Sequence, residues 1–337
     1  MSTLDKTEIA TAFGLNLGKR LGEGSFGVVF DIPTHRVVKF SDTDDVSLEN
    51  FIQEAKWQQT MSVAGVAPRV YPFPDGKLVH SAVVNGKTVG AFVMDGGDFD
   101  LHEYFDKFPN VDTSMWISKV IHLFSRLANK NILCHDLKAP NMVVQLVHDD
   151  RGEVTEVITD LLMIDFGNDF CQRTGMVLPM GVTKRTRHQF FKIVMLLLFC
   201  LNLTENYMDQ AEDLRDAIST MIRRRYMSSK TVVDAAFRYI YTNEQAYDVY
   251  EHYANFTPQE AMEFLKSVYP FDNFEALMFL DNSSESEVDI GGDYEPDKSV
   301  FDSPDSNDLF TYQDTEDYFD GRNEPVHSID ALDQFLY

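Results

Sequence analysis

Cysteine is scarce in this chain, and the three cysteines that it has lie far apart. Cys134, Cys171 and Cys200 show no paired spacing, and no cluster of histidines lies near them that would indicate a zinc site. We therefore expect reduced thiols and an intracellular protein of the cytoplasm or nucleus.

Long hydrophobic runs are also missing. The N-terminal MSTLDKTEIATAFG lacks the basic stretch followed by an apolar stretch that is typical of a signal peptide. The most apolar run, Phe190 to Leu201, is too short to cross a bilayer and contains Lys192. We predict that this run is a buried helix, and we expect no membrane association.

Positive charge is in short supply, with 29 Lys and Arg against 54 Asp and Glu and a net charge of −25. Nucleic acid and anionic membrane surfaces would be repelled, so a basic partner is the expectation. Residues 281–337 alone carry 17 acidic side chains against Lys298 and Arg322, a net charge of −15. This segment is rich in Ser, Asp, Gly and Pro and has no sustained period, which predicts an acidic, disordered tail.

Aromatic residues recur among the acidic residues of the tail, from Tyr294 to Tyr337. This composition is typical of a segment that docks on a basic, partly apolar groove, either in cis or on a basic partner. A merely solubilising tail is the alternative, and both interpretations stay open.

The first 95 residues predict a sheet with one helix. Short β-branched and aromatic runs separated by Pro, Gly and Asn turns predict a hairpin over 28–40 and strands over 70–73, 77–84 and 88–94. Between them, Leu48, Phe51, Ile52 and Ala55 form a helical stripe behind Ser47, a candidate N-cap.

The rest of the chain up to about residue 280 predicts mainly helix. Apolar residues recur at helical spacing through 116–127, 190–203, 208–226 and 231–241. Residues 142–164 are the exception, since two β-rich runs flank the polar HDDRGE and predict a long hairpin. With 44% hydrophobic residues in 337, the chain can bury a sizeable core of the α+β class.

A glycine-rich stretch, LGEGSFGVV, runs from Leu21 to Val29. Gly22, Gly24 and Gly27 match G-x-G-x-x-G, in which backbone N–H groups approach phosphate oxygens closely while a branched residue such as Val29 covers an adenine ring. A turn in an ordinary hairpin is the simpler alternative for this motif alone.

Charged residues that suit a nucleotide follow the glycine-rich stretch. Lys39 lies on the next predicted strand, where an ammonium would neutralise phosphates, and Glu54 is the best candidate for the carboxylate that holds it, with Glu49 second.

The segment HDLKAPN places three polar residues at close spacing. Asp136 could orient the proton of an attacking hydroxyl, Lys138 could steady the transferred phosphoryl group, and Asn141 could hold a metal ion. Further on, Asp165 begins an Asp-Phe-Gly sequence after an apolar strand, and its carboxylate suits magnesium.

The order of these motifs from Leu21 to Gly167 resembles the eukaryotic-type protein kinase family, and the resemblance covers about residues 14–280. It implies a bilobal fold with a small sheet lobe (14–95) that contains one helix, a larger mainly helical lobe (96–280), and ATP and Mg²⁺ between them, with residues 1–13 as an extension. Met94 would lie at the back of the adenine pocket, near a hinge at 95–98. Lys138, two residues after Asp136, resembles the serine/threonine-directed members, so the implied substrate is a protein hydroxyl.

The chain departs from the family pattern at five points, which concern regulation, packing, docking and the adenine site. His135 stands where an Arg usually binds a phosphorylated activation loop, so loop phosphorylation is not expected as a switch; Cys134, also divergent, is expected in the core. No Ala-Pro-Glu follows Gly167, and the helix near Gln189 lacks the usual buried Asp at its start. Val37 replaces the usual Ala before the lysine. The short strands, the shortened activation segment and the long hairpin after Asn141 resemble the compact kinases of large DNA viruses, which would place the protein in a host cell.

Three functions stay open from the sequence. An active serine/threonine kinase is favoured because Lys39, Glu54, Asp136, Asn141 and Asp165 are all intact. A catalytically weak, kinase-like binding module is the first alternative, because the segment after Gly167 is short. A small-molecule kinase of related fold is the second, and Lys138 speaks against it.

Overall fold

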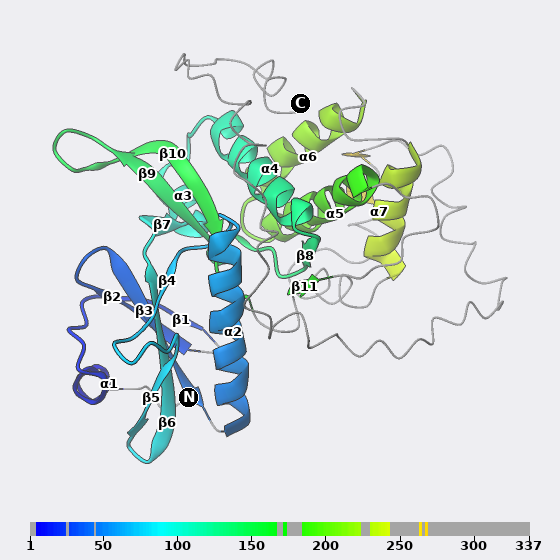
Figure 1. The fold of residues 1–337 in the computed structure, drawn as a ribbon. Coiled ribbons are helices and arrows are strands. Elements are labelled where there is room, and N and C mark those ends of the chain that lie inside the picture. Colours follow the sequence, from blue (N-terminus) through cyan, green and yellow to red (C-terminus); the bar gives the residue numbers. More distant parts are fainter. Residues whose placement is uncertain are drawn as a thin grey trace, which may run out of the picture. The chain divides into compact units, whose positions relative to one another are not determined.

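An antiparallel sheet, most of whose strands are joined by short connections, forms much of the first 95 residues (Figure 1). The computed structural model describes residues 5–24, 27–43, 45–166, 171–173, 184–223, 230–242, 263–264 and 267–268, all within one unit, Met1–Asp272. The strands are β1 (Arg20–Gly24), β2 (Gly27–Ile32), β3 (Arg36–Thr43), β4 (Val70–Tyr71), β5 (His80–Val84) and β6 (Lys87–Asp95). Their order is β1-β2-β3-β6-β4, and β5 also pairs with β6. The predicted hairpins are confirmed.

The turn between β5 and β6 shows why local sequence set these hairpins. Asn85 and Gly86 both have positive φ, 53° and 78°, which is the conformation that a two-residue hairpin turn requires and that Asn-Gly tolerates best. The resulting register pairs Val84 with Lys87.

The two faces of β3 bury different residues because side chains alternate along a strand. Val38 and Phe40 face a cluster that includes Phe30 and Ile9, whereas Val37 packs with Phe51 and Ala55 of α2 (Asp45–Val63). Lys39 shares the face of Val37, so the strand directs its ammonium toward α2.

The helix α2 begins earlier than predicted. Its helical backbone starts at Asp45, so Ser47 lies within the first turn and is not the N-cap. The apolar stripe marks the buried face of a helix and does not fix its first residue.

A second helix, α1 (Lys6–Phe13), lies in the residues expected as an extension, so this part of the fold holds more than the one helix expected. The Asp5 carboxylate caps it by accepting hydrogen bonds from the N–H groups of Thr7 and Glu8, and Gly14, with φ 62°, ends it. Ile9 is completely buried in the sheet core. The helix is therefore part of this core.

The remaining described residues are mainly helical, as predicted, and the fold is mixed α+β. Helices α3 (Leu101–Lys107), α4 (Thr113–Asn129), α5 (Lys184–Leu203), α6 (Met208–Arg223) and α7 (Lys230–Thr242) are accompanied by short strands. Within the described ranges, no helix has the length and apolar character needed to cross a bilayer.

The predicted long hairpin is confirmed as β9 (Met142–His148) and β10 (Val154–Met163), and β7 (Phe99–Asp100) pairs with β9. The strand β8 (Ile132–Cys134) leads into the HDLKAPN segment and pairs with β11 (Cys171–Arg173). The segments 167–170 and 174–183 and the predicted acidic tail, 281–337, lie outside the described residues.

Replacing Ile9 with Ala tests whether α1 belongs to the core. Removing a fully buried branched side chain is expected to lower the free energy of unfolding by about 3 kcal/mol, measured by urea denaturation. The control is Val63→Ala on α2, which removes two methyls from a side chain that is 71% exposed and is expected to cost under about 0.5 kcal/mol. Equal, small effects of both changes would mean that α1 does not stabilise the sheet.

Candidate functional site

A cavity of about 430 Å³ opens beside β1, β2, β3 and β6, which is within the size range of small-molecule sites. Seven of the eight residues expected to bind ATP line it, and so do both expected metal ligands: Leu21, Gly22, Gly27, Val29, Lys39, Glu54, Met94, Asn141 and Asp165. Gly24, the eighth, ends β1 opposite Gly27.

The apolar part of the cavity comes from strand residues on one face of the sheet. Val29, Val37, Phe92 and Met94 line it, and Ile164 lies in the lining as well. Val37 and Met94 are register partners on β3 and β6 and are nearly buried. A flat, apolar ring system such as a nucleobase suits such a surface.

The glycine-rich hairpin is sterically demanding at one glycine and tolerant at another. A Cβ at Gly27 would lie 2.1 Å from the carbonyl oxygen of Phe40 on β3, whereas a Cβ at Gly22 would meet no atom within 4 Å. Gly27 is therefore needed for the close pairing of β2 with β3, and Gly22 leaves open space at the cavity.

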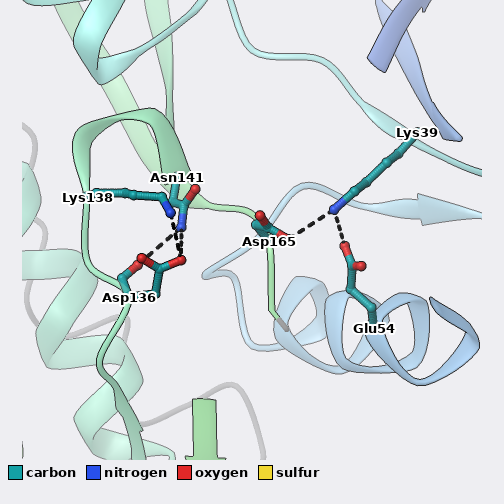
Figure 2. Close-up of polar contacts among 6 residues, drawn as sticks. All are labelled: Lys39, Glu54, Asp136, Lys138, Asn141 and Asp165. Atoms are coloured by element: carbon teal, nitrogen blue, oxygen red, sulfur yellow. Dashed lines mark hydrogen bonds and ion pairs between the residues drawn. The ribbon is translucent and has the colours of Figure 1, made fainter. Parts of the chain in front are cut away.

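A buried ion-pair network lies at the polar end of the cavity. Lys39 Nζ lies 2.6 Å from Glu54 Oε1 and 3.0 Å from Asp165 Oδ1 (Figure 2). Burial on its own would lower the pKa of Lys39, but the two carboxylates and their hydrogen bonds outweigh it, so this pKa is raised. The ammonium therefore stays charged, and of the two candidates Glu54 is its partner.

The backbone around Asp165 is strained in a way that fits a functional position. Asp165 has φ 63°, a left-handed conformation that is uncommon for a residue other than glycine. The preceding residue donates a backbone hydrogen bond from its N–H to the carbonyl of Asn141, at 2.9 Å. This bond places the two expected metal ligands at neighbouring points of the backbone.

The HDLKAPN segment brings its three polar residues together, as Figure 2 shows. Lys138 Nζ donates to Asp136 Oδ2 at 3.0 Å, and Asn141 Nδ2 donates to the same oxygen at 2.8 Å. Asp136 Oδ1 is buried and has no hydrogen-bond partner among the described residues. A buried carboxylate oxygen without a donor is costly, and it is suited to accept a proton or a hydroxyl hydrogen bond.

The donor set of the site suits a magnesium-bound nucleotide. Asn141 and Asp165 offer an amide and a carboxylate oxygen, and within the described ranges no group of three or more His, Cys, Asp and Glu side chains could hold a metal by itself. Mg²⁺ is usually held by one or two protein oxygens together with phosphate oxygens and waters. These residues therefore fit the ion when phosphates accompany it.

Several lining residues were not predicted from the sequence. Gln58 follows Glu54 by one helical turn on α2, a spacing that could have identified it, and its amide donates to the carbonyl of Pro68. Asp98, Asp100 and Glu103 add carboxylates to the lining near the start of α3. No local pattern marks them as cavity residues, because their placement depends on the pairing of β7 with β9.

The two divergent residues before Asp136 are both completely buried. Cys134 lies in the core, as expected. His135 Nε2 lies 2.9 Å from the hydroxyl of Tyr239 on α7, and burial lowers the pKa of His135 to about 4. A buried, neutral imidazole is unsuited to bind a phosphate, which agrees with the expectation from the sequence.

No protein-family model matches this chain, and no curated protein matches it in sequence.

Substituting Gly27 with Ala tests the close approach of β2 to β3. The new methyl group would have to displace the Phe40 carbonyl, so we expect the free energy of unfolding to fall by about 2 kcal/mol in urea denaturation. Gly22→Ala is the matched control and is expected to change stability by less than about 0.5 kcal/mol. If both variants were as stable as the wild type, the β2–β3 approach would be looser than described.

The His135 side chain predicts a specific pH dependence of stability. Its pKa in the folded state lies below the ordinary value of 6.5, so its contribution is complete above pH 6.5 and is lost as the pH falls toward 4. Between pH 7 and pH 5, the wild type is expected to lose about 2 kcal/mol more unfolding free energy than His135→Phe, which cannot be protonated there. Urea denaturation at both pH values measures this difference, and equal losses would show that His135 is not held neutral.

Proposed function

We propose that this protein is an Mg²⁺- and ATP-dependent serine/threonine protein kinase with the bilobal protein kinase fold. The observation that carries the proposal is the Lys39 network, in which one buried ammonium contacts Glu54 and Asp165 at the edge of the cavity. Asp165 follows Lys39 by 126 residues in the sequence, and the intact spacing of the kinase-like motifs agrees with this meeting.

The phosphate-facing role falls to Lys39. Glu54 holds the Lys39 ammonium in place without a ligand. The Lys39 side chain therefore loses little conformational freedom when phosphates bind. The cavity is partly apolar around this charge, which strengthens its attraction for an anion relative to water.

The metal-facing role falls to Asp165 and Asn141. A magnesium ion bound there would supply positive charge that neutralises phosphate oxygens. Asn141 turns its Nδ2 toward Asp136, which leaves its amide oxygen available as a ligand.

The hydroxyl-facing role falls to Asp136. Its Oδ2 is held by Lys138 and Asn141, and its Oδ1, which has no partner among the described residues, could accept the proton of an attacking serine or threonine hydroxyl. Lys138 beside it could also steady the transferred phosphoryl group. Catalysis would then consist mostly of positioning and charge neutralisation, without a covalent enzyme intermediate.

The first experiment is transfer of labelled phosphate from Mg·ATP to the protein itself and to a generic basic protein. Asp136→Asn is expected to reduce transfer about a thousandfold, because the general base is lost while the side chain keeps its shape. Binding of Mg·ATP, measured by calorimetry, should stay within about threefold of the wild type, because Asp136 is not part of the cavity lining.

Asp106→Asn is the matched control, since it makes the same chemical change at an exposed aspartate on α3 and is expected to leave transfer unchanged. Transfer that survives in Asp136→Asn would overturn the assigned role. Binding of Mg·ATP without transfer by the wild type would instead favour the kinase-like binding module or a small-molecule substrate.

A further inference from the structure

His135 joins the catalytic loop to a helix that is distant in the sequence. It precedes Asp136 directly, and its carbonyl accepts a hydrogen bond from the N–H of Leu137 at 2.8 Å. Its ring lies nearly parallel to the ring of Tyr239, with 20° between the planes and 6.0 Å between the centroids. The residue is thus fixed through both its backbone and its ring.

Tyr239 in turn is held by α5. Its ring meets Phe190 edge to face at 5.6 Å, and the side chain is almost completely buried. A continuous series of contacts therefore runs from Phe190 on α5 through Tyr239 on α7 to His135 and the catalytic loop.

The hydrogen bond between His135 and Tyr239 joins two uncharged side chains. Burial raises the pKa of Tyr239 to about 12, and the pKa of His135 is lowered. A protonated imidazole would need an acceptor for each ring nitrogen, and Nδ1 has no partner among the described residues. The contact between His135 and Tyr239 therefore forms without a charged group.

We propose that Tyr239 is a positioning residue that fixes the catalytic loop through His135, and thereby sets the direction of the Asp136 carboxylate. The catalytic loop would then keep one conformation, before substrate binds, through its packing against α7. This inference rests on the proposed kinase function only for its effect on turnover, since the holding of the loop can be measured without it.

The test variant is Tyr239→Phe, which removes one hydroxyl and keeps the ring that contacts His135 and Phe190. The matched control is Tyr104→Phe on α3, which removes a buried hydroxyl that donates to the carbonyl of Glu156 at 2.8 Å. Both variants lose one buried tyrosine hydrogen bond of similar length, so a general loss of stability should be similar in the two.

Two measurements on the full chain separate positioning from general stability. Hydrogen exchange of a peptide covering 132–141 is expected to be about tenfold faster in Tyr239→Phe and unchanged in Tyr104→Phe, because only the first hydroxyl holds the loop. The kcat for phosphate transfer is expected to fall about tenfold in Tyr239→Phe, with the KM for ATP unchanged, since misdirection of Asp136 affects the transfer step and not the cavity.

A double-mutant cycle identifies the route of the effect. If Tyr239 acts through the imidazole, His135→Phe combined with Tyr239→Phe should speed exchange of 132–141 no more than His135→Phe alone. Full additivity of the two changes would show that Tyr239 does not act through His135 and would overturn the proposal.

The outcomes distinguish the two proposals. A wild-type protein that binds Mg·ATP but transfers no phosphate would count against the kinase function, while exchange would still decide the role of Tyr239. Exchange in 132–141 that is equal in Tyr239→Phe and the wild type would overturn the positioning role, whatever the enzyme activity.

Discussion

The ion pair between Lys39 and Glu54 is the interaction on which the candidate site depends. Burying either charge alone would be prohibitively costly, so each requires the other within hydrogen-bond distance. That distance exists only because apolar residues of β3, β6 and α2 pack into one cluster, with Ala55 completely buried beside Glu54. The hydrophobic core of the sheet thus determines where the site's charge lies.

Charged contacts and neutral contacts lie on different sides of the HDLKAPN loop. On the cavity side, Lys39 and Asp165 form a charged pair, and Asp165 holds an uncommon backbone conformation that its surroundings must enforce. Behind the loop, His135 and Tyr239 form an uncharged hydrogen bond and packed rings. A charged contact attracts an anion and changes with its arrival, whereas a neutral packed contact holds one geometry. The neutral contact of His135 with Tyr239 therefore does not depend on the charges that line the cavity.

Local patterns in the sequence predicted the hairpins and helices, because these elements depend on residues that are close in the sequence. The hairpins followed from β-branched runs and turn residues such as Asn85-Gly86, and the helices followed from apolar spacing. Lys39, Glu54 and Asp136 were predicted as site residues from the order and spacing of their motifs, and Lys39 and Glu54 line the cavity. The predicted start of α2, after a cap at Ser47, was three residues too late, since sequence patterns fix helix termini only weakly.

Packing between residues that are distant in the sequence determined the remaining contacts. The sequence by itself determined the elements, their order and the candidate residues, because each depends on neighbours within a few positions. Only the tertiary structure placed Ile9 in the sheet core, joined Lys39 to Asp165, and brought Tyr239 to a histidine 104 residues earlier. No sequence pattern marked Ile9 or the pair of Tyr239 and His135, because these contacts result from the burial of whole strands and helices against one another.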